Sequence, residues 1–410
     1  MHPMLATLIP LFDENMSVKA YSIFTQKANY LMNPIYLGTG FNDGAGHITG
    51  LEVINSMGIE SLTTDSDIFV PVTNVSLFSD IAEQCEAPND RICILIDKGV
   101  RPEDMYVNRI QELKAMGFKF AIRKLAVPDF EPYRSILKLM DYIMLDHKKI
   151  VIEKARIYFS KVYPDIRLIA GNIETQEIFE GLKERGGYQL YEGEFYRVPI
   201  TKGNKEVAPV KINYIDLLNT VNNPDFDLTD AADIIQRDTA LVISLLEMVN
   251  HMAINSEITS IRHAAAMLGQ RELKKWITTA VTKQLCDDKP SEVARVSLLR
   301  AKFAENLAPI FELAGQSQEL FMMGLFSVLD VILDKPMSEA LNLVKVSKNV
   351  SRALIEKDGP YSSIYDFVLQ YESGNWTEID RIMLLNDMDS EAVFSAYIET
   401  LKWYRTLFIK

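Results

Sequence analysis

Strand-like and helix-like segments alternate along the first half of this chain, and this alternation restricts its fold more than any other feature. Six short apolar runs predict strands, and segments with the apolar spacing of helices lie between them. The predicted strands are residues 68–75, 92–97, 118–125, 142–146, 167–173 and 188–192, and the predicted helices include 106–116, 151–162 and 175–185. Such alternation is typical of βα units with parallel strands.

Two further strands are predicted ahead of these, at residues 4–12 and 18–25, joined by a turn at 13–15. The total of eight suits a TIM-like (β/α)8 barrel. About 200 residues is short for this fold, so we expect some of its helices to be truncated or missing. Barrels of this kind carry their functional groups at the carboxyl ends of the strands, which makes those ends the candidate site.

The pattern changes after residues 201–209, TKGNKEVAP, a polar segment that predicts a linker. Beyond it we find no convincing strand, and Asp238 is placed to cap one of a series of helices. The fold class is therefore α/β plus all-α. We predict a barrel domain at residues 1–203 and an all-helical domain at residues 204–410.

The composition limits what the chain can bind. Its 410 residues carry a formal net charge of −13, which argues against nucleic acids and anionic membranes, because either partner would need a basic face. The three cysteines lack the CxxC spacing of a zinc site. No apolar run approaches membrane-spanning length, and the first residues lack the basic region of a signal peptide. These features predict a cytoplasmic protein without membrane insertion.

Four segments of the first half together resemble EAL-type cyclic di-GMP phosphodiesterases. FKFAIRKL at 118–125 stands where that family has IALDDFG, and MLDHKKI at 144–150 is similar to KIDRSFI. AGNIET at 170–175 resembles AEGVET, and YEGEFYRVPI at 191–200 resembles VQGYYFSRP. Their order, spacing and strand-end positions extend the resemblance over about residues 5–199, which implies a barrel of EAL type.

The helical half resembles the HDOD domain, a helical output module of bacterial signalling proteins. The similar segments are QRDTALVISLLEMVN at 236–250, ITSIRHAAAMLGQRELKKWI at 258–277 and FMMGLFSVLDVIL at 321–333. The combination of an EAL-type barrel with an HDOD domain is a known architecture, so each resemblance supports the other.

The EAL resemblance implies a site with two hydrated metal ions, which activate a water molecule and neutralise the phosphate. Most residues of that site are replaced here. Ser22 replaces the signature glutamate, and Gln26 replaces an arginine expected to touch the phosphate. Arg123 and Lys124 replace two aspartates, and Met144 replaces the catalytic lysine. The other replaced positions are Pro71 for an asparagine, Ile94 and Gly171 each for a glutamate, and Glu192 for a glutamine. Asp146 and Glu174 are retained, and Asp97 lies at another strand end.

Arg123 and Lys124 weigh most heavily against metal binding. Repulsion between unit charges about 4 Å apart is on the order of 4 kcal/mol near a protein surface. The three carboxylates Asp97, Asp146 and Glu174 are too few for a two-metal site beside these cations. We therefore expect no catalytic residue, metal or cofactor in the barrel. We also hypothesise that Arg123, rather than Lys124, points into the barrel and pairs with one of these carboxylates.

The helical half lacks the signature of an HD-type phosphohydrolase, because neither His251 nor His263 is followed by an aspartate. The sequence thus favours a non-catalytic regulatory scaffold in bacterial cyclic di-GMP-linked signalling. Its expected partners are other signalling proteins, with a homodimer left open and cyclic di-GMP binding disfavoured. The alternatives are a nucleotide receptor that binds cyclic di-GMP without hydrolysis, and a residual metal-dependent phosphodiesterase.

Overall fold

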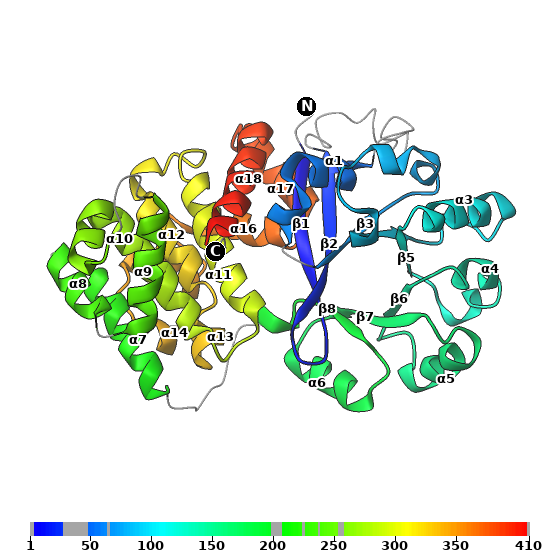
Figure 1. Cartoon of the computed structure of the whole chain (residues 1–410), viewed down its shortest axis with the longest axis horizontal. Coiled ribbons are helices and arrows are strands. Elements are labelled where there is room, and N and C mark those ends of the chain that lie inside the picture. The colour runs from blue at the N-terminus through cyan, green and yellow to red at the C-terminus, as the bar shows by residue number, and fades with distance from the viewer. Residues whose placement is uncertain are drawn as a thin grey trace. The chain divides into compact units, whose positions relative to one another are not determined.

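The computed structural model describes residues 4–27, 48–63, 66–197, 207–223, 226–236, 238–252 and 258–407, and it forms two compact units (Figure 1). The first, which we call the barrel unit, comprises Met1–Val198, Lys302–Ser317 and Ser363–Lys410. The second, the helical unit, comprises Pro199–Ala301 and Gln318–Ser362. In the part of the chain that is described, no helix is long and apolar enough to cross a membrane.

Eight strands close into a barrel in the order of the chain, which confirms the predicted barrel. The strands are β1 (Met4–Phe12), β2 (Val18–Lys27), β3 (Asp67–Pro71), β4 (Ile92–Ile96), β5 (Lys119–Arg123), β6 (Tyr142–Asp146), β7 (Arg167–Ile173) and β8 (Leu190–Gly193). Strands β2 to β8 pair in parallel, whereas β1 is antiparallel to both of its neighbours. The antiparallel start follows from the turn after β1, where Asp13 accepts hydrogen bonds from the backbone N–H groups of Asn15 and Ser17.

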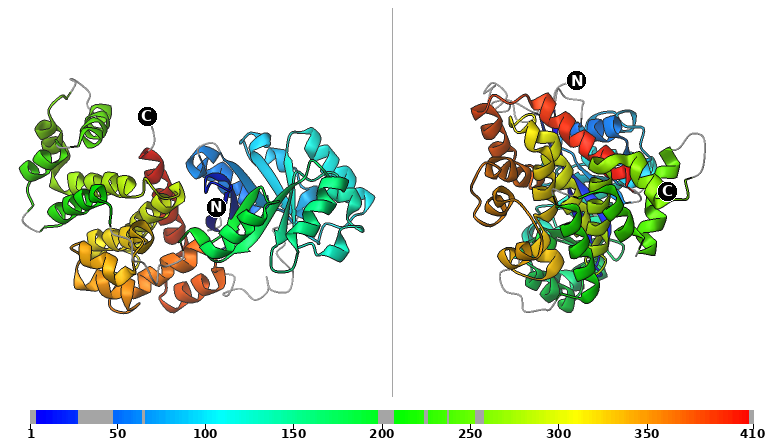
Figure 2. Two further views of the ribbon diagram at one scale, coloured as in Figure 1. Left: turned by 90° about the horizontal axis from the view of Figure 1, so that it is seen from below. Right: turned by 90° about the vertical axis from the view of Figure 1, so that its left-hand side faces the viewer.

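The helices around the barrel are short, as the length of this region predicts (Figure 2). They are α1 (Thr49–Met57), α2 (Ile59–Leu62), α3 (Asp104–Ala115), α4 (Arg134–Leu137), α5 (Ile152–Val162) and α6 (Gln176–Arg185). Between β3 and β4 the described chain forms single 3-10 turns instead of an α-helix. Within the barrel, nine buried side chains make the core: Leu11, Ala20, Phe69, Cys93, Leu95, Ala121, Tyr142, Ile169 and Leu190.

The end of the chain covers the open part of strand β1. Only Leu11 and Phe12 of β1 pair with β8, so the earlier part of this edge needs other partners. There, Tyr371 accepts a hydrogen bond from the backbone N–H of Ala6 (3.4 Å), and Thr7 donates to the carbonyl of Glu372 (3.3 Å). The covering helices are α16 (Ser362–Glu372), α17 (Trp376–Leu385) and α18 (Ser390–Thr406), and α18 packs against β1.

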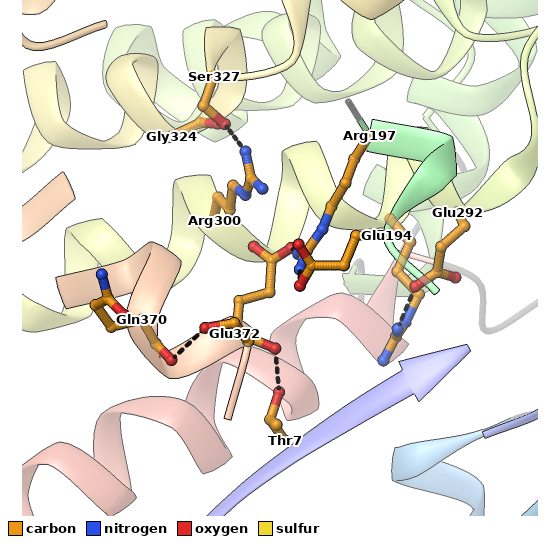
Figure 3. Close-up of polar contacts among 11 residues, drawn as sticks. Thr7, Glu194, Arg197, Glu292, Arg300, Gly324, Ser327, Gln370 and Glu372 are labelled. Carbon is orange, nitrogen blue, oxygen red and sulfur yellow. Dashed lines mark hydrogen bonds and ion pairs between the residues drawn. The ribbon is translucent and has the colours of Figure 1, made fainter. Parts of the chain in front are cut away.

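An ion pair also holds this covering in place. Arg197, in the turn that follows β8, pairs with Glu372 at the end of α16 and with Glu194 (Figure 3). The Tyr371 ring packs against Phe303 and Trp376 in the same unit. Segments from three parts of the chain therefore form one core with the barrel.

The helical unit contains no strand among its described residues. Its helices are α7 (Pro209–Val221), α8 (Leu228–Ile235), α9 (Thr239–Met252), α10 (Ile261–Leu285), the start of α11 (Ser291–Leu307), α12 (Ser317–Phe326), α13 (Leu329–Leu333), α14 (Met337–Leu343) and α15 (Lys348–Ile355). Asp238 caps α9, as expected, by accepting from the backbone N–H groups of Ala240 and Leu241. A Cβ atom at Gly324 would lie 2.4 Å from the backbone of Arg300, so glycine permits α12 to lie directly on α11 (Figure 3).

The two compact units do not follow the predicted division into residues 1–203 and 204–410. Lys302–Ser317 and Ser363–Lys410 belong to the barrel unit, although their pattern is helical. Helical periodicity shows that a face is buried, but it does not show which neighbour buries that face. That the two functional domains divide between residues 203 and 204 stays a prediction.

We predict that Tyr371→Ala will lower the free energy of unfolding of the barrel unit by about 3–5 kcal/mol, because it empties a fully buried ring site. Tyr371→Phe should cost only about 1 kcal/mol, since it removes the single hydrogen bond to Ala6. Chemical denaturation, with hydrogen exchange of the β1 amides as a local readout, measures both changes. If both substitutions lower the free energy of unfolding by the same small amount, the covering helices do not stabilise β1.

Candidate functional site

Seven residues form a layer that follows the barrel core toward the carboxyl ends of the strands. Each lies two positions after a core residue, and because strand side chains alternate, each occupies an inward-facing position. We call this set the mouth layer; its members are Ser22, Pro71, Asp97, Arg123, Met144, Gly171 and Glu192. All seven were singled out from the sequence, six of them as replaced positions of the EAL site.

Three carboxylates at this end of the barrel are each bound by a lysine. Lys124 pairs with Asp97 (3.2 Å), Lys149 with Asp146 (3.0 Å) and Lys148 with Glu174 (2.6 Å). Each of these pairs is at least partly exposed to solvent.

The lysines lower the pKa values of their partners. Burial alone would raise the pKa of Asp97, but the N–H of Gly99 and the ammonium of Lys124 outweigh it and hold this pKa below its usual value. For Asp146, burial again acts upward, but the bonds from the Lys149 ammonium and the Lys148 backbone N–H, together with the charge of Lys149, outweigh it and lower this pKa. The hydrogen bond and charge of Lys148 lower the pKa of Glu174. The carboxylates are therefore ionised and already neutralised by the chain itself.

Arg123 does not make the ion pair that the sequence analysis assigned to it, so that hypothesis is wrong about the residue. Among the described residues, the cation bonded to Asp97 is Lys124, and the buried Nε of Arg123 has no hydrogen-bond partner. The reason lies in the backbone. Strand β5 ends at Arg123, and Lys124 takes a left-handed conformation (φ 63°), in which the alternation of strand side chains no longer holds.

Burial lowers the pKa of Arg123, and the negative charges of Asp97 and Glu192 act against this shift. Arg123 thus lies within the electrostatic influence of both carboxylates without bonding to either. An arginine side chain remains charged under these conditions, since its ordinary pKa exceeds 12.

Gly171 and Met144 create the space in which the Glu192 carboxylate lies. A Cβ atom at Gly171 would be 3.0 Å from Met144 Cγ and 3.3 Å from Glu192 Oε2. The backbone N–H of Asn172, itself left-handed at φ 63°, donates to Glu192 Oε2 (3.2 Å). Burial raises the pKa of Glu192, more than the Asn172 bond and the charge of Arg123 lower it. A glutamate at position 171 would compete with Glu192 for this volume.

The remaining predicted positions differ in what they contribute. Ser22 is buried, and its Oγ has no hydrogen-bond partner in the described structure. Ile94 lies between the core residues Cys93 and Leu95, so it faces out of the barrel and is not in the mouth layer. Gln26 pairs with Leu5 through the backbone of β2, and its side chain lies outside the described part.

The mouth layer does not fit a pair of metal ions. Hard divalent ions need clustered oxygen ligands, and Asp97, Asp146 and Glu174 at this end of the barrel are each bound to a separate lysine. Across the described ranges, no group of three or more His, Cys, Asp or Glu side chains could hold a metal. The pairing lysines Lys148 and Lys149 were not singled out from the sequence, although two lysines almost directly after the strand-end Asp146 were a visible signal.

In the helical unit, His263 is exposed in the first turn of α10, and its backbone N–H is capped by Ser260. His251 lies near the end of α9, and its side chain is outside the described part. Residues 208–356 match the model of the HDOD domain. The second half of this chain carries an HDOD domain.

Proteins from two bacteria are similar to this chain over almost its whole length. The uncharacterized protein YuxH of Bacillus subtilis is 27% identical over 410 residues, covering 97% of each chain. Cyclic di-GMP phosphodiesterase CdgJ of Vibrio cholerae is 25% identical over 400 residues, covering 96% of this chain and 90% of that protein. The predicted combination of an eight-stranded barrel with an HDOD domain is confirmed.

Solved structures are similar to part of the chain. An EAL domain protein from Listeria monocytogenes has 16% identity and a TM-score of 0.36, covering 47% of this chain and 86% of that one. BlrP1 of Klebsiella pneumoniae, in a calcium and cyclic di-GMP complex, has 14% identity and a TM-score of 0.36, covering 48% and 57%.

We predict that Lys124→Met will raise the pKa of Asp97 toward its ordinary value of about 3.9, because it removes the ammonium while the Gly99 bond remains. The folded-state pKa is depressed, so the stability that Asp97 contributes is present above the unfolded pKa and is lost as the pH falls through the folded pKa. In Lys124→Met the folded-state pKa of Asp97 is higher, so this loss of stability should begin at a higher pH. An NMR titration of the Asp97 carboxyl measures the shift.

The matched control is Lys154→Met, which removes an exposed lysine from α5. It should leave the Asp97 titration unchanged. An unchanged Asp97 pKa in Lys124→Met would mean that the ion pair does not hold in solution.

Proposed function

We propose that this chain is a non-catalytic regulatory protein, an EAL-like pseudoenzyme joined to an HDOD domain, which acts through contacts with other signalling proteins. The observation that carries the proposal is the pairing of Asp97, Glu174 and Asp146 with Lys124, Lys148 and Lys149. In such an arrangement the protein's own ammonium groups provide the positive charge that metal ions provide in a two-metal hydrolase.

Hydrolysis would need bound metal ions and a catalytic lysine. A metal ion would have to displace an ammonium from each carboxylate and lie beside Arg123, whose charge is permanent. By the family resemblance, the catalytic lysine is also replaced, by Met144. No member of the mouth layer is therefore assigned a catalytic role, and the replaced positions are proposed to be structural.

The signalling context comes from the relatives. CdgJ, which matches 96% of this chain, is named a cyclic di-GMP phosphodiesterase, and this supports a link to cyclic di-GMP signalling. The replaced and lysine-bound residues at the barrel mouth support the proposal that this chain does not catalyse the phosphodiesterase reaction. We place the protein in the cytoplasm on its composition, in particular its net charge of −13 and its three cysteines without CxxC spacing.

A receptor that binds cyclic di-GMP without cleaving it is the second candidate. The specific observation in its favour is Arg123, a charged inward-facing side chain without a bonded carboxylate among the described residues. A residual phosphodiesterase is the third candidate and has the least support, because its metal ligands are replaced or bound to lysines.

We predict that the purified full-length protein will not release linear dinucleotide from cyclic di-GMP in the presence of magnesium or manganese. An active EAL phosphodiesterase, assayed in parallel by chromatography, provides the positive control. Metal-dependent release that disappears in Asp146→Ala would overturn the proposed function. Calorimetry with cyclic di-GMP then separates the first two candidates, because heat of binding without turnover identifies a receptor.

A further inference from the structure

Three large apolar side chains of the barrel unit are exposed near one another, in the chain after β3 and at the start of α3. Val75, Phe78 and Met105 are 45%, 43% and 53% exposed. We call this set the apolar platform. Apolar surface in water costs free energy in proportion to its area, so a cluster of such side chains indicates a contact surface.

The rings of Phe78 and Tyr106 connect the two segments of the apolar platform. Their centroids are 5.4 Å apart, and Tyr106 directly follows Met105 in α3. Phe78 also donates its backbone N–H to the carbonyl of Val75 (3.2 Å), which places both residues in one tight turn. The three side chains therefore form a single patch rather than separate exposed positions.

Arg109 fixes this turn to α3. It lies four residues after Met105, so the two side chains share a face of the helix. Its guanidinium donates to the carbonyl of Leu77 through Nε (3.0 Å) and to the carbonyl of Ser79 through Nη2 (2.6 Å). The face of α3 that carries Met105 is thereby held against the turn that carries Phe78.

The turn is also held by its own side chains. Thr73 and Ser76 bond reciprocally, since the hydroxyl oxygen of each accepts the backbone N–H of the other (3.0 and 3.1 Å). The Leu77 side chain is buried and anchors the same turn. The apolar platform is thus already ordered, and binding to an ordered surface carries a smaller entropic cost.

The carboxylates next to the apolar platform are exposed. Asp80 follows Phe78 by two residues, and Asp104 directly precedes Met105. An apolar centre flanked by carboxylates is complementary to an apolar stripe flanked by lysines or arginines.

The cations of this region do not cancel the charge of the two aspartates. Arg101 pairs with Glu103 (4.0 Å), and Arg109 pairs with Glu112 (2.7 Å). Each arginine is matched by a glutamate of its own, so the negative charge beside the apolar platform is left for a partner.

We propose that the apolar platform is the docking surface for a basic amphipathic helix of a partner protein. The apolar stripe of such a helix covers the three exposed side chains, and its lysines or arginines face Asp80 and Asp104. A second copy of this chain is a poorer occupant, because it brings the same carboxylates and a formal net charge of −13.

This inference rests on the proposed function, in which the protein acts through contacts with other proteins, and it adds the surface and the chemistry of the partner. The two fail separately. Hydrolysis of cyclic di-GMP would overturn the proposed function, whereas failure of a basic helix to bind at the apolar platform would leave the proposed function standing.

The test is a titration of the full-length protein with a synthetic helical peptide that has a leucine face bordered by lysines, measured by fluorescence anisotropy. The apolar platform is small, so we expect a Kd on the order of 100 μM. Added salt should weaken this binding. A second peptide, with glutamates in place of the lysines, should bind about tenfold more weakly or not at all.

Substitutions at the apolar platform should weaken binding of the lysine peptide. We expect a loss of about fivefold in Met105→Gln and about threefold in Val75→Thr, because each replaces apolar contact by a polar group of similar size. Asp104→Asn should cost about twofold and reduce the salt dependence. The matched control is Met116→Gln, which changes a methionine of similar exposure (44%) at the other end of α3 and should bind as the wild type does. Circular dichroism establishes that each variant is folded.

Methyl NMR of the methionines shows where the peptide binds. The Met105 signal, assigned by its loss in Met105→Gln, should shift with the Kd that anisotropy gives. The Met116 signal, assigned in the same way, should stay in place.

Equal binding of the two peptides, an unmoved Met105 signal, or equal affinities of Met105→Gln and Met116→Gln would overturn the proposal. Absence of binding by the lysine peptide would overturn it as well. A Met105 signal that shifts with protein concentration, with no peptide present, would identify a second copy as the occupant and would also overturn it.

Discussion

The pairing of strand β1 is the constraint on which the barrel unit depends. A barrel is stable because it has no open edge, yet β1 meets β8 through only two residues, Leu11 and Phe12. The rest of this edge is covered by Tyr371 and Glu372 from the end of the chain. The closure of the barrel, and with it the position of every mouth residue, thus depends on helices far from the barrel in sequence.

The mouth itself is organised by charge. In a metal-dependent site, acidic side chains are held near one another by the cations between them, and removal of those cations would leave the carboxylates repelling each other. Here Asp97, Asp146 and Glu174 each have their own lysine, and the inward-facing cation Arg123 lies close enough to Asp97 and Glu192 to be affected by both. Under the proposed function, this arrangement needs no metal ion to hold its carboxylates in place.

The sequence predicted the strands of the barrel well, because each is an apolar run bounded by helical segments, as in ICILI of β4 and KFAIR of β5. The family resemblance had singled out the residues of the mouth layer one by one, but it also included Ile94, which faces out of the barrel. It could not predict that Lys124 would bond to Asp97, because this depends on a left-handed residue where the alternation ends. The placement of Tyr371 against β1 was equally hidden, since helical periodicity does not identify the neighbour.

The return of the chain to the barrel unit has a consequence for the order of synthesis. Ser363–Lys410 belong to the barrel unit, and the HDOD domain is encoded before them. A ribosome completes the eight strands early but supplies the cover of β1 last, so the nascent barrel has an open strand edge throughout translation of the helical unit. Open edges of this kind pair readily with other strands. The nascent chain is therefore most prone to misassembly, and most in need of chaperones, while the helical unit is being translated. Any rearrangement of the gene that exchanges the HDOD domain must also preserve the final helices, or the first half loses its cover.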